Sequence, residues 1–195
     1  MSGSKETKRY LVRLSESNSI KPFDCGFPDL NQFLFDDAIP HLQQLLAVTY
    51  LLETKSDTIA YFSVLNDKIT LEEVAKSSFN KLSRKIPHAK YRESYPSVKI
   101  GRFAVSAAYQ RNNIGTALLD YIKGYFIDRN KTGCRFITVD AYPQAVPFYE
   151  KNGFLPLILK EPKKDTSKEP KDDNRAMFFD LYPFSVKAKN IKMIK

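Results

Sequence analysis

The sequence is poor in the residues that build metal centres and disulfide scaffolds. Its 195 residues include two cysteines, Cys25 and Cys134, and two histidines, His41 and His88. So few thiols and imidazoles argue against a structural metal and against a disulfide framework. The first ten residues are polar and basic, without the apolar core of a secretion signal. We therefore expect a cytoplasmic protein without a metal site.

Long apolar runs are also missing. No stretch reaches the roughly 18 uncharged apolar residues that a membrane-spanning helix needs. The most apolar region, residues 45–52, has only the length of a strand. With 43% hydrophobic and 27% charged residues, the chain has the composition of a globular protein rather than a disordered one. We expect a single domain over residues 1–195 and no association with a membrane.

Acidic residues are absent from two segments that are rich in lysine and arginine. The chain has a formal net charge of +9; segment 76–92 contains six basic residues and segment 187–195 contains four, all without an acid. Such runs are usually solvated surface, but they also suit a polyanion partner such as nucleic acid. By contrast, residues 160–173 balance five lysines against five acids. We expect 160–173 and the unpatterned stretch 79–95 to be flexible, and 187–195 to form a basic tail.

The hydrophobic pattern predicts alternating strands and helices. The clearest element is a helix whose apolar stripe runs from Ile114 to Phe126 at helical spacing. Strands are expected at 10–14, 46–52, 59–64, 97–106, 134–139, 154–159 and 175–181. Further helices are expected after Leu30, at 71–77 and at 145–152, where Gly153 ends the helix.

Two local features refine this prediction. Asp24 is the expected N-cap of the helical region after Leu30, and Pro40 should divide that region into two pieces. Segments 46–52 and 59–64 form a hairpin, whereas the later strands alternate with helices. The predicted fold class is therefore α/β, with a mixed, twisted β-sheet flanked by helices.

A tight polar loop, residues 110–113, precedes the helix that begins at Ile114. The first turn of a helix has unpaired backbone N–H groups and a partial positive charge, which suit a pyrophosphate. Asn113 and Gly115 both tolerate unusual backbone angles, and Gly115 lets an anion approach the main chain. The loop has neither the ending of a Walker A motif nor the three glycines of a dinucleotide fingerprint. By itself it is equally consistent with an ordinary helix start.

Three segments occur in order: Ile100-Gly101-Arg102-Phe103-Ala104-Val105, Gln110-x-x-Asn113-x-Gly115 followed by Ala117-Leu118-Leu119, and Ala145-x-x-Phe148-Tyr149-x-Lys151-x-Gly153-Phe154. Together they resemble the acetyl-CoA-binding half of the GNAT superfamily of N-acetyltransferases. Asn113 stands where that family has the first glycine of its loop. The resemblance implies an α/β, single-domain GNAT-like fold and acetyl-CoA as the co-substrate.

Two earlier segments add to the resemblance: Phe23-Asp24-Cys25-Gly26-x-x-x-Leu30-Asn31-x-Phe33-Leu34, and then Ala60-Tyr61-Phe62-Ser63. They look like the GNAT branch that includes toxins of toxin–antitoxin pairs, which acetylate the amino acid on charged transfer RNA. The resemblance implies charged tRNA as the amine acceptor, an antitoxin as partner and, since GNAT enzymes often dimerise, a homodimer. Not every member of such a branch is a toxin.

The resemblance also assigns roles to single residues. It implies that the backbone of Phe103, Ala104 and Val105 pairs with the pantetheine arm. Tyr149 matches the tyrosine that donates a proton to the departing thiolate of coenzyme A, although without the motif it would be interpreted as a core aromatic beside Phe148. The residues implied to bind acetyl-CoA are Phe103, Ala104, Val105, Gln110, Arg111, Asn112, Asn113, Ile114, Gly115 and Thr116.

The expected reaction is direct attack of a neutral amine on the thioester carbonyl. Neither Cys25 nor Cys134 has a histidine nearby in sequence, which argues against a covalent cysteine intermediate. No general base stands out. An α-amine, with a pKa of about 8, is substantially neutral at pH 7 to 8, whereas a lysine amine, at about 10.4, is not. This favours an α-amine, while a small amine, a protein N-terminus and a non-catalytic module that binds RNA or protein stay open as alternatives.

Overall fold

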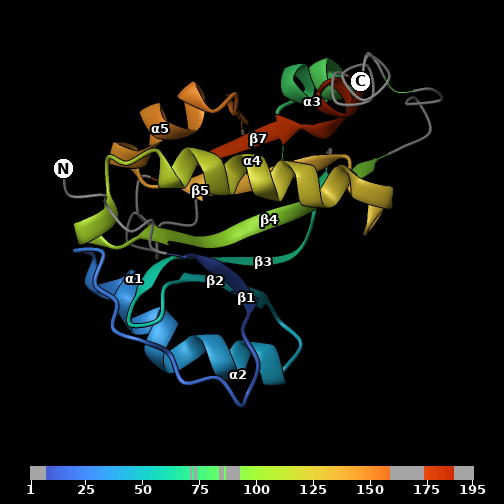
Figure 1. Ribbon diagram of the computed structural model, residues 1–195. Coiled ribbons are helices and arrows are strands. Elements are labelled where there is room, and N and C mark those ends of the chain that lie inside the picture. Colours follow the sequence, from blue (N-terminus) through green and yellow to red (C-terminus); the bar gives the residue numbers. More distant parts are fainter. Residues whose placement is uncertain are drawn as a thin grey trace, which may run out of the picture. The chain divides into compact units, whose positions relative to one another are not determined.

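The computed structural model describes residues 8–70, 72, 74–83, 86, 93–158 and 174–186. Within these ranges, seven strands form a sheet in the order β1-β2-β3-β4-β5-β7-β6 (Figure 1). The chain forms two compact units: residues 1–65 with 100–119 make the first unit, and residues 66–99 with 120–195 make the second. Strands β3 (Thr58–Thr70) and β4 (Ser94–Val105) and helix α4 (Ile114–Ile127) contribute to both units. The predicted α/β class and the helix predicted from Ile114 are confirmed.

The first unit contains the predicted hairpin. Strand β2 (Val48–Glu53) pairs antiparallel with β3, with Val48 opposite Val64, and β1 (Tyr10–Arg13) pairs antiparallel with the other edge of β2. The first seven residues of β3 are all buried, so both of its faces are covered there. This burial fits the continuous apolar and β-branched run at the start of the strand.

Helices α1 (Pro28–Gln32) and α2 (Ala38–Gln43) of the first unit are joined by a π-helical turn, η1 (Phe33–Asp37). The two helical pieces were predicted, but Pro40 does not divide them. It lies in the first turn of α2, directly after the π-turn, which is where the irregularity of the helical region falls. Contacts of Tyr61, a residue of β3, show that the helices pack on this strand. Its hydroxyl donates to the Leu30 carbonyl at 2.7 Å, and its ring lies over Phe33.

In the second unit, β7 (Arg175–Asp180) lies between β5 (Phe136–Ala141) and β6 (Leu155–Pro156) and is antiparallel to both. A 3-10 turn, η5 (Pro143–Ala145), leads into helix α5 (Val146–Lys151). Gly153 follows α5 with a φ of +83°, as expected for a residue that ends a helix. The predicted strand 154–159 is reduced to the two residues of β6.

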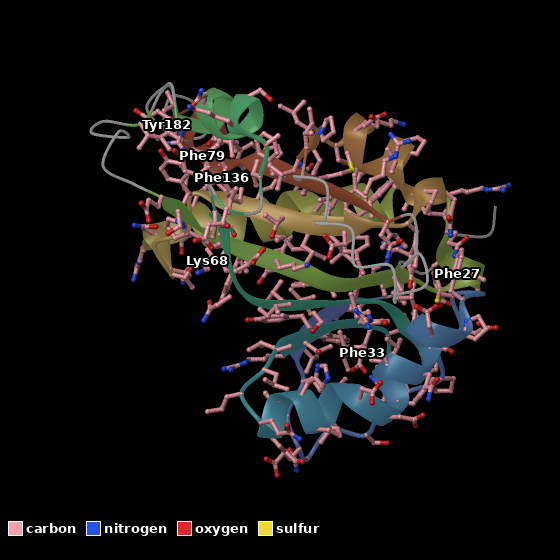
Figure 2. The ribbon with its side chains drawn as sticks, turned by 180° about the vertical axis from the view of Figure 1, so that it is seen from behind. Phe27, Phe33, Lys68, Phe79, Phe136 and Tyr182 are labelled. Carbon is pink, nitrogen blue, oxygen red and sulfur yellow. The ribbon has the colours of Figure 1, made fainter. Side chains whose placement is uncertain are left out.

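Helix α3 (Lys76–Ser83) corrects two predictions in the second unit. The predicted helix 71–77 lies too early, and 79–83 and 94–95, which were expected to be flexible, belong to α3 and β4. Phe79 and Leu82, three residues apart, are both buried in a cluster with Tyr95, Phe136 and Phe178. Figure 2 labels Phe79 and Phe136 of this cluster. The sequence pattern did not predict this helix, because basic residues surround the two apolar ones.

Two other segments, 160–173 and 187–195, lie outside the described residues. No helix within the described ranges combines the length and the apolar character needed to cross a lipid bilayer.

Replacing Phe79 tests whether α3 contributes to the core. We expect Phe79→Ala to lower the free energy of unfolding by about 3–5 kcal/mol, because it leaves a cavity beside Tyr95. Urea denaturation followed by circular dichroism measures this change. Phe35→Ala is the control, since Phe35 is 46% exposed and its loss should change stability by no more than about 0.5 kcal/mol. Equal effects of the two substitutions would contradict the packing of α3.

Candidate functional site

The loop before α4 has two residues in the left-handed backbone region. Asn113 has a φ of +57° and Arg111 a φ of +63°. Asparagine tolerates this region better than most residues, which fits its place where the GNAT family has a glycine. Gly115 lies in the first turn of α4 and does not have a positive φ. Arg111 also has a left-handed backbone angle, which could not be predicted from the sequence because arginine does not favour that region.

Asn113 also begins the helix. Its carbonyl accepts the N–H of Ala117 at 3.0 Å, the first bond of α4. The N–H groups of the helix start at Ile114, Gly115 and Thr116 therefore have no partner within the helix. Residues 110–113 are exposed, and residues 110–116 contain no acidic side chain. Ile114 itself is buried and Gly115 and Thr116 are half-buried. The start of α4 is thus a group of backbone donors with positive potential that lies directly behind an exposed loop without acidic side chains.

The side chain of Gln110 connects this loop to two neighbouring segments of the first unit. Its side-chain Nε2 donates to the carbonyl of Val105 at 3.0 Å and to the carbonyl of Cys25 at 3.1 Å. The backbone N–H of Ala107 donates to the carbonyl of Asp24 at 2.8 Å. The amide hydrogens of Gln110 are therefore committed to the protein, and its side chain supports the loop; its predicted part in binding acetyl-CoA stays a prediction.

The segment that Gln110 contacts is itself held by a small network. Asp24 Oδ1 accepts the N–H of Gly26 at 2.8 Å and the side-chain amide of Asn31 at 2.7 Å. Asn31 Oδ1 in turn accepts the N–H of Cys25 at 3.0 Å. Asp24 is therefore not the N-cap of α1, which is Phe27. It joins the chain before α1 to the helix, and the prediction missed this role of Asp24 and Asn31.

The end of β4 holds the segment predicted to pair with pantetheine. Ala104 is buried, whereas Phe103 and Val105 are half-buried. The carbonyl of Val105 is already used by Gln110. The predicted pairing of this segment stays a prediction.

Tyr149 lies on α5 in the second unit and is 5% exposed. Its ring contacts Phe148 and Phe154 edge to face, with 5.3 Å between ring centroids in each pair. Burial raises the pKa of the Tyr149 phenol well above its ordinary value. A phenol keeps its proton at neutral pH even at its ordinary pKa of about 10, and burial makes its ionisation harder still.

The other reactive side chains have unremarkable surroundings. Cys25 and Cys134 are free thiols, and burial raises the pKa of both, so neither is poised as a thiolate nucleophile. The His41 ring packs against Phe33. Among the residues that the structure describes, no three His, Cys, Asp or Glu side chains gather as a group that could hold a metal ion.

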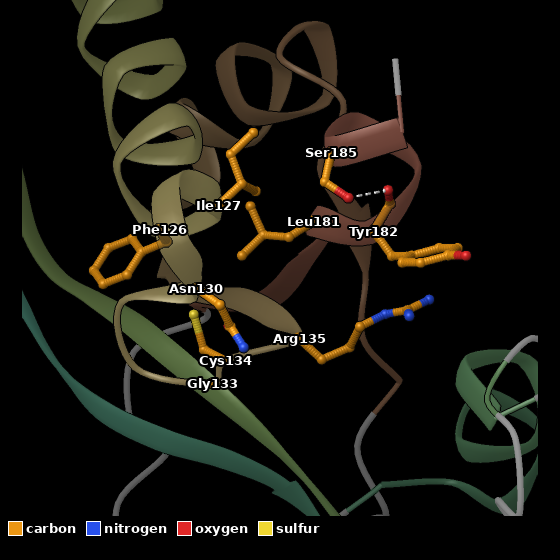
Figure 3. A pocket seen from close by; sticks show the side chains of 9 residues that line it. All are labelled: Phe126, Ile127, Asn130, Gly133, Cys134, Arg135, Leu181, Tyr182 and Ser185. Atoms are coloured by element: carbon orange, nitrogen blue, oxygen red, sulfur yellow. Dashed lines mark hydrogen bonds between the residues drawn. The ribbon is translucent and has the colours of Figure 1, made fainter. Parts of the chain in front are cut away.

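The second unit also contains a cavity of about 330 Å³ between the end of α4, the start of β5 and residues 181–186 (Figure 3). Arg135 at its edge forms an ion pair with Asp180, with Nε 2.8 Å from Oδ1, and lies over the ring of Tyr182. Its charge is thus already compensated. None of the residues predicted to bind acetyl-CoA lines this cavity.

Residues 84–165 match the family model of the acetyltransferase (GNAT) domain. Over residues 84–165, which are less than half of the chain, the sequence is similar to the GNAT family. This is a family of acetyl-CoA-dependent N-acetyltransferases. The matched segment contains β4, the loop 110–113, α4 and the helix that bears Tyr149. No curated protein sequence matches the chain.

Solved structures show the same GNAT fold over most of the chain. AtaT complexed with acetyl-methionyl-tRNAfMet is 20% identical, with a TM-score of 0.71 over 93% of this chain and 99% of that one. A tyrosine-to-phenylalanine mutant of KacT is 19% identical, with a TM-score of 0.71 over 92% and 98%. A tyrosine-to-phenylalanine mutant of the AtaT toxin, bound to the C-terminus of the antitoxin AtaR and acetyl-CoA, is 18% identical, with a TM-score of 0.68 over 92% and 97%.

The two bonds of Gln110 allow a test of the GNAT loop. In Gln110→Glu a carboxylate would face two carbonyl oxygens, so we expect the loop to loosen and the Kd for coenzyme A to rise about tenfold. Isothermal titration calorimetry measures this constant. Gln43→Glu, an exposed position on α2, makes the same chemical change and should leave the Kd as it is. An unchanged Kd in both variants would show that Gln110 does not support the binding loop.

Proposed function

We propose that this GNAT domain transfers the acetyl group of acetyl-CoA to a primary amine, and that this amine is the α-amine of an aminoacyl-tRNA. The observation that carries the transfer is the start of α4, where backbone donors without partners in the helix follow an exposed loop, within a segment that matches an acetyl-CoA-dependent family. Two facts support the acceptor: the likeness to AtaT complexed with acetyl-methionyl-tRNAfMet, and the net charge of +9.

The first unit would bind the diphosphate of acetyl-CoA. The N–H groups at the start of α4 point away from the helix they begin, and the positive end of the helix dipole lies there. Arg111 is exposed beside these donors and adds a full positive charge. Donors, dipole and guanidinium all favour an anion, so the residues present fit the group that the family uses.

Acetyl-CoA, when bound, supplies an acetyl group already activated as a thioester. The Tyr149 hydroxyl holds a proton at neutral pH, as a phenol does at its ordinary pKa of about 10, and we assign to it the protonation of the departing thiolate. A backbone N–H of residues 103–105 is assigned to the negative charge that develops on the carbonyl oxygen. The acceptor amine must arrive neutral, and an α-amine satisfies this near pH 8.

Removing the Tyr149 hydroxyl tests its role. We expect Tyr149→Phe to lower kcat about a hundredfold, the lower end of the range for proton transfer by a side chain, and to leave the affinity for coenzyme A unchanged. Transfer of radiolabelled acetyl groups to methionyl-tRNA measures kcat. Tyr182→Phe is the matched control, since Tyr182 is exposed and its ring contact with Arg135 survives the change. A kcat within twofold of the parent in Tyr149→Phe would remove Tyr149 from the mechanism.

The same assay identifies the acceptor when methionyl-tRNA, methionine amide, a peptide and a polyamine are compared. A tRNA acceptor predicts a preference for methionyl-tRNA that weakens by about tenfold or more between about 50 and 200 mM salt, because phosphate contacts release counterions. Transfer to another amine with no dependence on tRNA would retain the enzyme and reject this acceptor. Binding of coenzyme A and tRNA without any transfer would contradict the proposed activity.

The pH profile of kcat/KM offers an independent check. The active form of Tyr149 is the protonated one, which is present below its pKa, and that pKa is raised above its ordinary value of about 10. With an α-amine acceptor, kcat/KM should rise to about pH 8, where the amine is neutral, and show no alkaline fall below about pH 10. Initial rates from pH 6 to 10 measure this. A fall near pH 9 would argue against Tyr149 as the donor, and a rise that continues to pH 10 would contradict attack by an α-amine with a pKa of about 8.

Two partners complete the proposal. A solved relative binds the C-terminus of the antitoxin AtaR, and by extension we assign to this protein an antitoxin that blocks its activity. A homodimer is the expected assembly, on the resemblance to GNAT enzymes alone. Light scattering of the purified protein and co-expression with a neighbouring gene test these two assignments separately.

A further inference from the structure

A lysine in the second unit is buried although the proposed chemistry does not use it. Lys123 lies on α4 and is 4% exposed. An ammonium group is costly to bury unless hydrogen bonds or opposite charges compensate it. The partners of Lys123 therefore indicate what keeps it there.

The ammonium group of Lys123 has two oxygen partners of different character. Its Nζ donates to the carbonyl of Asn152 at 2.9 Å and to Asp120 Oδ1 at 3.1 Å. Asp120 is more than half exposed, so water screens that pair, whereas Asn152 is buried. Nζ also lies 4.6 Å from the centre of the Phe179 ring, which covers it on one side. The bond to Asn152 is the one that burial strengthens.

Asn152 is the residue that ends the helix of Tyr149. Its backbone N–H donates to the carbonyl of Tyr149 at 3.0 Å, and its side-chain amide donates to the carbonyl of Phe148 at 2.8 Å. Two residues later, the N–H of Phe154 also donates to the carbonyl of Tyr149, at 3.0 Å. The end of α5 is thus tied to the carbonyls of Phe148 and Tyr149, and Lys123 holds Asn152 from outside the helix.

We propose that Lys123 is a positioning residue, which holds the Asn152 carbonyl and thereby fixes the end of α5 and the orientation of Tyr149. Helix α5 has only six residues, too few to be stable without such support. A small rotation of the helix would move the phenol, and a misplacement of about 1 Å can cost up to a hundredfold in rate. The inference rests on the proposed function, in which Tyr149 donates the proton.

The test uses Lys123→Met, which keeps the side-chain stem over Phe179 and removes the ammonium group. The matched control is Lys131→Met. Lys131 also pairs with an aspartate three residues before it, at 3.4 Å from Asp128, and also lies over an aromatic ring, that of Tyr125. It differs in being exposed, and it lies outside the machinery assigned to acetyl transfer.

We expect Lys123→Met to lower kcat about tenfold with the KM for acetyl-CoA within twofold of the parent, and Lys131→Met to change neither. The decisive measurement is a double-mutant cycle with Tyr149→Phe. If Lys123 acts through the phenol, Lys123→Met lowers kcat less than twofold in the Tyr149→Phe background. An equal loss in both backgrounds shows a merely structural role and overturns the proposal. If Lys123→Met does not fold, Lys123→Arg, which keeps a cation but shifts its donors, takes its place in the cycle.

Hydrogen exchange of the amides of Asn152, Gly153 and Phe154 provides a readout that needs no activity. Lys123→Met should speed their exchange at least tenfold relative to the amides of β5, and Lys131→Met should not. A parent protein that transfers no acetyl group would refute the proposed function, and the exchange data would then decide the Lys123 contact alone. Parent-like exchange in Lys123→Met overturns the proposal in either case.

Discussion

The first turn of α4 has backbone N–H groups that the helix cannot bond, and much of the candidate site is organised around this constraint. A buried helix start without partners would be costly, whereas an open one attracts an anion. Here the exposed loop 110–113 leads into the helix start, and Arg111 and Asn113 both take left-handed angles in it. Gln110 holds the loop to Val105 and Cys25. In the proposed reaction, this helix start is what gives the domain its affinity for a diphosphate.

Sequence patterns predicted best where one physical requirement acts along consecutive residues. The stripe from Ile114 to Phe126 and the β2–β3 hairpin follow from local burial, and both are confirmed. The prediction was wrong at α3, since Phe79 and Leu82 are two apolar residues among many basic ones and only their partners in the core reveal the helix. Residue type also misled at Asp24 and Pro40. Aspartate favours an N-cap, but the Asp24 carboxylate accepts hydrogen bonds from Gly26 and Asn31 instead. Proline favours a helix boundary, but Pro40 lies within the first turn of α2.

The support of the site was hidden from the sequence for a different reason. Gln110 is 85 positions from Cys25 and donates a hydrogen bond to its main-chain carbonyl. Every residue has such a carbonyl, so the residue type of the acceptor does not reveal the bond. The bond between Lys123 and the carbonyl of Asn152 is of the same kind. The family resemblance could therefore name residues such as Asn113 and Tyr149, but it could not show which side chains hold them. Side-chain bonds to distant carbonyls become visible only in a fold.

Burial of Tyr149 connects its chemistry to its support. Removing water raises the pKa of the phenol, so the tyrosinate form is disfavoured in the buried state. The same burial means that the ring cannot adjust freely, since Phe148 and Phe154 pack against it. Its orientation must then come from the helix that bears it, and α5 is too short to fix itself. A buried cation at the end of α5 is costly as packing alone, but it is understandable as the means by which a short helix presents a phenol in one orientation.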